Sequence, residues 1–330
     1  MVPDERPSAP RAGDDAKKVL GLSAALAAVI VVMLLAFVLP NHGSGPNAAP
    51  IGTVGVAAQQ AGARLDPRGW DVRPYEDARA LQAVIKDREV VGGIESTGRQ
   101  WRIYTAMAAA PQVTAALTSA GSAGAQAAGT IARPVEVVPF PQGDPRGTGL
   151  AGAGLPLVFG GLLPVALFFN LLTGARRNRL EIVGVATYSL IAGFGVALFL
   201  QLVFETIDGS ILLNGLGLSL GIGALAMTQL ALMTAFGYVG FGIGAAIAML
   251  VGNPLSGLAS GPYWLPDGWA TLGQILPPGA AGSLLRATGL FDATGALGPA
   301  LILGGWLLIA LATLAFATRT TGDPTPIATA

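Results

Sequence analysis

The chain has 330 residues, of which 52% are hydrophobic and only 12% are charged, whereas an ordinary soluble domain has about 25% charged residues. Its formal net charge is zero, its mean hydropathy is +0.60 and it has no cysteine. This composition excludes a disulfide framework, a thiolate metal site and a cysteine nucleophile, and it offers no basic cluster for nucleic acid. We therefore expect a membrane protein that has lipids, and no nucleic acid, around it.

Several uncharged apolar runs are long enough to cross a hydrocarbon core about 30 Å thick, which needs roughly 20 helical residues. They lie at residues 20–39, 155–172, 182–204 and 297–318. Residues 211–252 are also uncharged, but one helix of this length would span about twice the bilayer thickness. We interpret this run as a hairpin of two helices that turns near residues 234–238. The sequence thus predicts an α-helical polytopic protein with six transmembrane helices.

The predicted organisation alternates membrane segments with one large and one smaller outside segment. In chain order we expect a cytoplasmic tail (1–18), transmembrane helix 1 (19–39), an extracytoplasmic α/β domain (40–150), transmembrane helices 2–5 (151–252), an outer re-entrant or interfacial segment (253–297), transmembrane helix 6 (298–318) and a cytoplasmic tail (319–330).

Lysine and arginine counts in the short segments predict the orientation. Lys17 and Lys18 precede the first run, whose apolar part is too long for a signal peptide, so we interpret it as an uncleaved anchor. Arg176, Arg177 and Arg179 crowd the loop between the second and third spans, whereas residues 205–210 contain two acids and no base. Both termini are therefore predicted to be cytoplasmic, in a multi-pass protein of the cell membrane.

Short β-rich runs alternate with helical ones between residues 51 and 139, which is typical of a small α/β domain. Strands are expected at residues 51–56, 70–75, 89–94, 100–106 and 131–138, and helices at 58–65, after Asp77 and from Pro111. Asp77 suits a helix N-cap and Pro111 suits a first helical turn. Residues 119–130, which are rich in Ala, Gly and Ser, are expected to form a flexible or weakly helical connector.

The outside domain lacks a nucleotide-binding fingerprint. Gly55 follows the first strand, but Gln59 and Gln60 stand where a dinucleotide loop needs glycine. We therefore expect a folded spacer or a recognition module without a catalytic role.

Residues 217–221, with the sequence Gly-Leu-Ser-Leu-Gly, match the pattern of a hydrolase nucleophile around Ser219. A serine needs a base to become a nucleophile, and the one histidine of the sequence is His42, outside the first span. We favour close helix packing by small residues, including Gly240 and Gly244, over an intramembrane enzyme.

Polar side chains in the apolar spans are candidates for lining a substrate path, or alternatively for interhelical hydrogen bonds. These candidate path-lining residues are Asn170, Gln201, Asn214, Thr228 and Gln229. No P-loop exists, since the only lysines are Lys17, Lys18 and Lys86 and none lies in a glycine-rich loop. The chain is thus expected to bind no cofactor itself, and any ATP would be bound by a partner subunit.

The segment after residue 252 has the most distinctive local sequence. Prolines and glycines interrupt helix there, and Tyr263, Trp264 and Trp269 suit the headgroup level of a membrane. A short helix beyond Pro278 is expected to lie in the outer interface or to dip into the membrane, either as a passive cap or as a substrate gate. The candidate outer-gate residues are Asn253, Pro254, Trp264, Trp269, Gln274, Pro277 and Pro278.

With these residues in view, the chain resembles the ABC-2 type transporter permeases, and within them the phage-infection-protein-like branch common in actinobacteria. The resemblance rests on one span, an outside domain and five further spans, on residues 143–147 (Gly-Asp-Pro-Arg-Gly) and on residues 253–280. It implies a permease subunit that forms a homodimer and pairs with separate ATPase subunits for export.

The resulting hypothesis is an export permease half that moves a lipidic or amphipathic substrate out of the cytoplasm. The substrate would follow the second and fifth spans and leave beneath residues 253–291. Arg176, Arg177 and Arg179 are candidate ATPase contacts, although membrane orientation explains them equally well. The alternative is a non-transporting membrane protein that presents residues 40–150 as a binding or assembly module.

Overall fold

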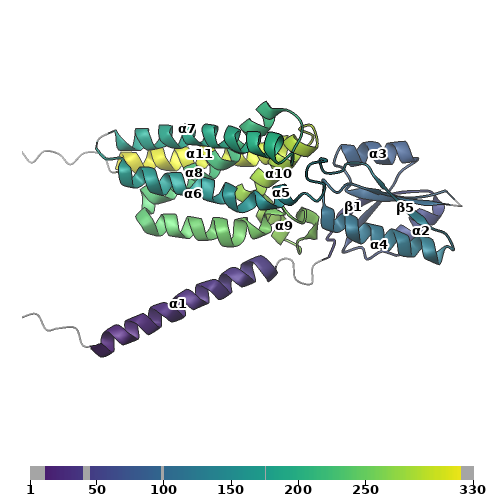
Figure 1. Ribbon diagram of the computed structural model, residues 1–330, viewed down its shortest axis with the longest axis horizontal. Helices are drawn as coiled ribbons and strands as arrows, with labels where there is room; N and C mark the ends of the chain where they lie inside the picture. Colours follow the sequence, from purple (N-terminus) through teal and green to yellow (C-terminus); the bar gives the residue numbers. More distant parts are fainter. Residues whose placement is uncertain (1–11, 40–44, 98–99, 175, 321–330) are drawn as a thin grey trace, which may run out of the picture.

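A computed structural model describes residues 12–39, 45–97, 100–174 and 176–320, so that His42 lies outside the described residues. A helical bundle and an α/β domain lie end to end along the long axis of the molecule, and the first helix, α1 (Ala12–Val38), is inclined away from the bundle (Figure 1). We call the end of the bundle that meets the α/β domain the domain end, and the opposite end the far end.

The α/β domain contains one five-stranded mixed sheet with strand order β2-β1-β3-β4-β5. Its elements are β1 (Ala49–Val54), α2 (Val56–Gly62), β2 (Trp70–Pro74), α3 (Ala78–Lys86), β3 (Gly92–Ser96), β4 (Trp101–Thr105), α4 (Pro111–Ala127) and β5 (Ala132–Glu136). Only β3 and β4 pair antiparallel, while β1 pairs in parallel with both β2 and β3. This central position of β1 follows from two crossover helices, α2 and α3, that return the chain in the same direction.

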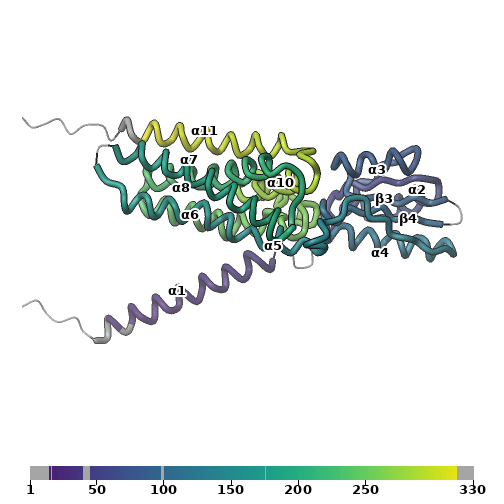
Figure 2. Tube along the Cα trace, turned by 45° about the horizontal axis from the view of Figure 1, so that its top comes forward, coloured from purple at the N-terminus to yellow at the C-terminus, as the bar shows by residue number. Residues whose placement is uncertain are grey.

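Helices cover both faces of the sheet, as Figure 2 shows. On one face, Leu117 of α4 packs with Ile103 and Trp101, and α2 completes the layer with Ala58. On the other face, α3 buries Leu81 and Ile85. The predicted N-cap is confirmed, because the Asp77 carboxylate accepts hydrogen bonds from the N–H groups of Arg79 and Ala80, both at 2.8 Å.

The prediction of a connector at residues 119–130 is wrong, because the helix α4 continues to Ala127. Its small residues are packing positions: a Cβ on Gly121 would lie 2.8 Å from Cδ1 of Ile103, and one on Gly124 would lie 3.0 Å from the Trp101 ring. Glycine lets α4 approach the sheet closely here, and this packing outweighs the low helix propensity of glycine.

The remaining elements form the bundle and the irregular structure at its domain end. They are α5 (Thr148–Gly152), α6 (Gly154–Leu171), α7 (Arg177–Leu198), η2 (Phe199–Val203), α8 (Ile211–Ile247), η3 (Ala248–Gly252), η4 (Pro254–Ser256), η5 (Pro262–Trp264), α9 (Trp269–Ile275), α10 (Pro277–Leu290) and α11 (Leu297–Thr320). The helix α8 is central, since it contacts α6, α7, α10 and α11.

Five helices of the described chain are long and apolar enough to cross a membrane. They span Lys17–Val38, Thr148–Leu171, Arg177–Val203, Ile211–Gly252 and Leu297–Ala317. Their outward faces expose large apolar side chains, for example Leu163 at 63%, Ile191 at 70% and Leu308 at 70%. A surface of this kind is stable in hydrocarbon and not in water, so the protein is membrane-embedded.

The chain reverses its direction within α8. Gly237 has φ 65° and ψ −151°, which lies outside the helical region. Glycine adopts this conformation without strain because it has no Cβ. Beyond it the two arms pack side by side, since a Cβ on Gly244 would lie 2.6 Å from both Gln229 and Leu232. In a continuous helix residues 229 and 244 would be about 22 Å apart. The reversal falls inside the predicted turn at residues 234–238.

Residues 217–221, which match the nucleophile pattern around Ser219, lie in α8 at a close contact with α7. The Ser219 hydroxyl donates to the carbonyl oxygen of Gly215 at 2.7 Å, and a Cβ on Gly193 of α7 would lie 2.6 Å from the Ser219 Cα. Small residues on both helices therefore bring the two backbones together, as helix packing in membranes requires.

We predict that Gly193→Val destabilises the protein by roughly 3 kcal/mol, because the added methyl groups would collide with the backbone of α8. Gly195→Val is the matched control, since Gly195 lies two residues away on the same helix and a Cβ added there would meet no atom within 4 Å. The measurement is the free energy of unfolding in mixed micelles. Equal losses for the two variants would contradict this packing.

Candidate functional site

The segment after residue 252 folds into a helical hairpin at the domain end of the bundle. The helices α9 and α10 are joined at Leu276, whose extended backbone turns the chain, and Pro277 and Pro278 occupy the first turn of α10. Proline suits these positions because the N–H groups of a first turn have no partner within the helix. The side chain of Gln274 ties the hairpin together: its Nε2 donates to the carbonyl oxygen of Ser256 at 2.9 Å, and its Oε1 accepts from Ser283.

The helix α10 is a core helix of the bundle. Leu284 belongs to a buried cluster with Ala224 of α8 and Leu303 of α11, and a Cβ on Gly221 would lie 2.7 Å from Ala281. The helix α10 packs against both α8 and α11. Its small residues remove the steric barrier to close packing, and an amphipathic polar face is missing.

The guanidinium of Arg286 lies buried at the junction of α10, the loop after η4 and the α/β domain. The side chain is 3% exposed. Its Nη1 donates to the carbonyl oxygen of Ala108 at 2.7 Å, and its Nη2 donates to those of Gly257 at 3.1 Å and Leu258 at 2.9 Å. One cation on α10 therefore holds two other segments through their backbone carbonyls, so that three segments are joined.

Burial lowers the pKa of Arg286 to about 10, and repulsion by Arg88 acts in the same direction. The group therefore remains protonated at neutral pH. Because a buried cation is costly without partners, the three carbonyl dipoles are what keep it in place.

A second arginine fixes the other side of the same junction. Nη1 of Arg88, in the loop after α3, donates to the carbonyl oxygen of Thr294 at 3.0 Å, and its guanidinium lies 5.0 Å from the centre of the Phe291 ring. Burial lowers the pKa of Arg88, while the nearby Tyr263 raises it. Two arginines thus attach the α/β domain to the hairpin and to the segment that follows it.

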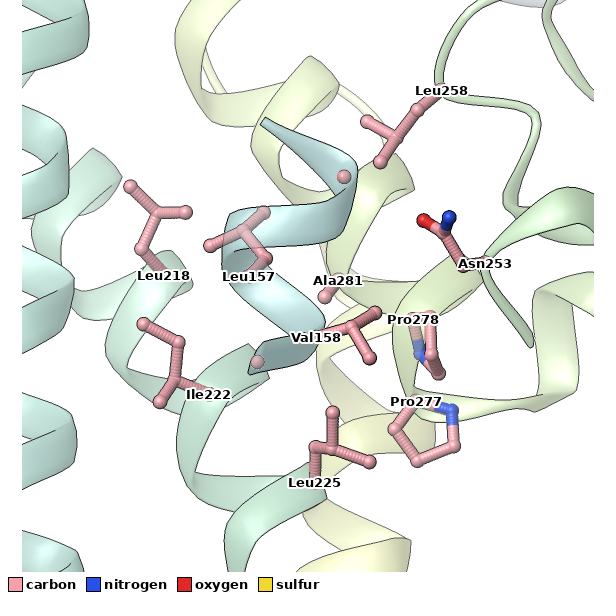
Figure 3. Close-up of a pocket in the computed structure, with 12 residues that line it drawn as sticks. Leu157, Val158, Leu218, Ile222, Leu225, Asn253, Leu258, Pro277, Pro278 and Ala281 are labelled. Atoms are coloured by element: carbon pink, nitrogen blue, oxygen red, sulfur yellow. The ribbon is translucent and has the colours of Figure 1, made fainter. Parts of the chain in front are cut away.

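A small closed cavity lies where α6, α8, η3 and α10 meet (Figure 3). Its volume is ≈ 20 Å³, which is about the room that one water molecule needs. The lining residues are Gly154, Leu157, Val158, Leu218, Gly221, Ile222, Leu225, Asn253, Leu258, Pro277, Pro278 and Ala281. Asn253 is the one polar side chain among them, so the lining is almost wholly apolar, and we call this space the closed cavity because of its small volume.

The structure brings three of the candidate outer-gate residues together at this cavity, namely Asn253, Pro277 and Pro278. The others lie apart. Pro254 faces a neighbouring cavity, and Trp269 is 51% exposed beside α1. Trp264 and Tyr263 pack against the core of the α/β domain.

The candidate path-lining residues are distributed over the length of the bundle. At the far end, Asn170 accepts from the Tyr238 hydroxyl at 2.6 Å and donates to the carbonyl oxygen of Ala166. At the domain end, Asn214 donates to Gln201 at 3.1 Å. None of the five lines the closed cavity.

Two of the path-lining candidates lie between these ends. Thr228 donates to the carbonyl oxygen of Ala224 in its own helix at 2.7 Å. Gln229 is 1% exposed between the arms of α8, and its Oε1 has no partner within the described structure. The five side chains therefore lie at different levels of the bundle, and among them only Asn214 and Gln201 are hydrogen-bonded to each other in the described structure.

The three arginines of the far-end loop differ in their surroundings. Nε of Arg177 donates to the buried carboxylate of Glu181 at 2.8 Å, and its guanidinium lies 3.9 Å from the centre of the Phe169 ring. Arg176 and Arg179 are more open to their surroundings. Only these two are therefore accessible to an outside partner, while Arg177 stabilises the start of α7.

Sequence reasoning missed the roles of Arg286 and Asp144. Asp144 is 7% exposed, and its carboxylate accepts from the N–H and hydroxyl of Thr148, at 2.9 and 2.8 Å, and from the Gly149 N–H at 2.8 Å. An acidic residue shortly before Thr148 and an apolar run is a readable capping signal. Burial raises the pKa of Asp144, but these hydrogen bonds outweigh it and hold the pKa below its ordinary value.

Comparisons with protein-family models, with curated proteins and with solved structures found no match to this chain. The site is therefore interpreted from its geometry alone.

We predict that Arg286→Met lowers the free energy of unfolding by about 3 kcal/mol, because it leaves buried carbonyl groups without a donor. Arg133→Met, on the exposed side of β5, is the control and should change it by less than about 0.5 kcal/mol. Limited proteolysis of the junction should accelerate in the Arg286 variant alone. An unfolding free energy like that of the control would refute this role.

We predict a pH dependence carried by Asp144. Because its folded-state pKa is depressed, its contribution is fully present above the unfolded value of about 3.9 and is lost as pH falls through the folded value. Asp144→Asn should therefore be less stable than the parent chain at pH 7, and the difference should shrink below about pH 4. Thermal midpoints measured from pH 3 to pH 7 test this, and a difference that is constant over this range would contradict it.

Proposed function

We propose that the chain is the permease half of an ATP-driven exporter, working as a homodimer with separate ATPase subunits. The substrate is proposed to be lipidic or amphipathic. The single observation that carries this proposal is the α9–α10 hairpin, which enters the domain end of the bundle and closes a cavity there.

The proposed topology has six spans. The reversal at Gly237 divides the long α8 into two arms, which together with the other four candidate spans gives six crossings. Both termini are then on the same side, and the arginine-rich loop at the far end places them in the cytoplasm. The α/β domain and the α9–α10 hairpin lie on the outside.

In this proposal α10 is the outer gate. Its first turn, Pro277 and Pro278, forms one wall of the closed cavity, and Arg286 and Arg88 attach its other end to the outside domain. Substrate release would require α10 to move, because a cavity of ≈ 20 Å³ admits nothing larger than water. The outside domain would then either drive or restrain that movement of α10.

The far-end loop is the proposed coupling surface. Arg176 and Arg179 are available to meet acidic groups of an ATPase, whereas Arg177 is held by Glu181. The chain itself has no P-loop lysine, so the energy source has to be a partner.

A binding or assembly module is the second candidate function, and one observation favours it. A groove of ≈ 320 Å³ lies between α2 and α4, above Trp101 of the sheet, and its rim carries Gln60 and Arg64. The nearby Val56 and Ile131 are 72% and 78% exposed. Exposed apolar side chains next to a groove are typical of a recognition surface.

We predict that tagged protein, extracted from native membranes in mild detergent, recovers a P-loop ATPase detectable by mass spectrometry. The double variant Arg176→Glu/Arg179→Glu should reduce this recovery about tenfold, because it reverses both available charges of the coupling surface. Arg68→Glu/Arg133→Glu reverses two exposed charges of the outside domain and should leave recovery unchanged.

Arg177 is left intact in this experiment because its substitution would also strip Glu181 of its partner. Recovery of no ATPase, under conditions that preserve other membrane complexes, would remove the exporter proposal and favour the binding module.

A further inference from the structure

Two larger cavities flank the start of the segment after residue 252, on the side that faces α1. One has a volume of ≈ 510 Å³ and the other ≈ 260 Å³. Each is lined in part by the last turns of α1 and by residues of the segment 253–260, of which Leu255 lines the larger cavity and Asn253 and Ser256 line the smaller one. We call them the apolar chamber and the polar chamber.

The apolar chamber is a wedge between α1 and the second arm of α8. Leu35 and Ala36 line it from α1, Ala246 and Leu250 line it from the α8–η3 arm, and Trp269 stands at its rim. Figure 1 shows why it exists: α1 diverges from the bundle and approaches it only near the domain end. Both walls belong to candidate membrane spans, so hydrocarbon rather than water is the stable filling.

The polar chamber continues the wedge toward the outside domain. Phe37 lines it from α1, and Asn253, Ser256 and Ser260 supply amide and hydroxyl groups next to the backbone of Gly152 and Gly257. Ala36 and Phe37 are partly buried, whereas the other described side chains of α1 are exposed. The covered part of α1 within the described chain is therefore two adjacent residues, Ala36 beside the apolar chamber and Phe37 beside the polar chamber.

Neither chamber is lined by an acidic or basic side chain. Arg286 lies behind the wall, where its guanidinium is occupied by the carbonyls of Gly257 and Leu258. Sites for phosphate or carboxylate head groups use arginine or lysine for recognition. A hydroxyl-bearing, uncharged head group matches the polar chamber, and one hydrocarbon chain matches the apolar one.

We propose that the two chambers together bind one amphiphile, with an acyl chain along α1 and an uncharged, hydroxyl-bearing head against Asn253, Ser256 and Ser260. As the substrate site of an exporter this inference rests on the proposed function, but binding itself needs no ATPase. Asn253 lines both the polar chamber and the closed cavity, so it connects this site with the proposed gate.

The test uses a monoacylglycerol that carries a photoreactive diazirine on its acyl chain, added to the purified full-length protein in nanodiscs. Cross-links are expected in the last turns of α1 and in residues 246–251, mapped by mass spectrometry. Unlabelled monoacylglycerol should compete for this labelling, and phosphatidylglycerol should compete at least about fivefold less well, as one missing cationic contact implies.

Two variants fill the apolar chamber, Ala36→Trp and Ala246→Trp. Each should reduce cross-linking about tenfold, because the bulky ring overlaps the acyl chain. Ala27→Trp is the matched control: it lies on the same helix about 180° around from Ala36, is exposed, and should label like the parent chain. Ala259→Lys, at an exposed position of the polar chamber, should bring phosphatidylglycerol up to equal competition.

Labelling that is unchanged in both filling variants, or equal competition by phosphatidylglycerol in the parent chain, would overturn the proposal. The cross-link sites of the parent chain also test the proposal without any variant. Sites in the last turns of α1 and in residues 246–251 support it, and sites elsewhere contradict it. Specific labelling without a recovered ATPase would leave the amphiphile site standing and remove only the exporter. Recovery of an ATPase without specific labelling would leave the exporter proposal standing and remove the amphiphile site.

Discussion

The arrangement of the domain end depends on one buried cation. Arg286 is enclosed by protein, and its guanidinium is satisfied by backbone carbonyls from the α/β domain and from the loop after η4. Because carbonyl dipoles are fixed by the chain that carries them, the cation is stable only while all three segments keep their places. The position of α10, the position of the α/β domain and the shape of the closed cavity are therefore coupled to one another. Arg88 strengthens it from the opposite side.

Around this junction the bundle is regular at one end and irregular at the other. The far end has simple helix ends, while the domain end collects two π-helical turns, η2 and η3, and the α9–α10 hairpin. Wide turns of this kind often occur at functional sites. The closed cavity and the two chambers beside α1 all lie in this irregular region, and Asn253 touches two of the three. A single polar side chain thus lines both the closed cavity and the polar chamber.

Sequence reasoning succeeded where one local rule decides the structure. Charge-free length located the apolar helices and the reversal near Gly237, and capping chemistry located Asp77 and Pro111. It failed where the partner is distant. The helical part of residues 119–130 is stabilised by Trp101 and Ile103, and Trp264 by the domain core, and neither contact leaves a local pattern. The role of Arg286 was missed, because its acceptors are backbone carbonyls that any sequence possesses. Asn253, Pro277 and Pro278 were found because helix-breaking residues in an apolar run are conspicuous.

The position of β1 has a mechanical consequence. The helix α1 ends at Val38, and β1, which begins at Ala49, is hydrogen-bonded on both edges, to β2 and to β3. A pull on α1 along the strand direction would load both ladders in shear, so that many hydrogen bonds resist together instead of opening one after another. An edge strand at this place would peel away under a smaller force. A force applied to β1 along its direction is therefore carried by both neighbouring strands at once, and the sheet resists it as a unit.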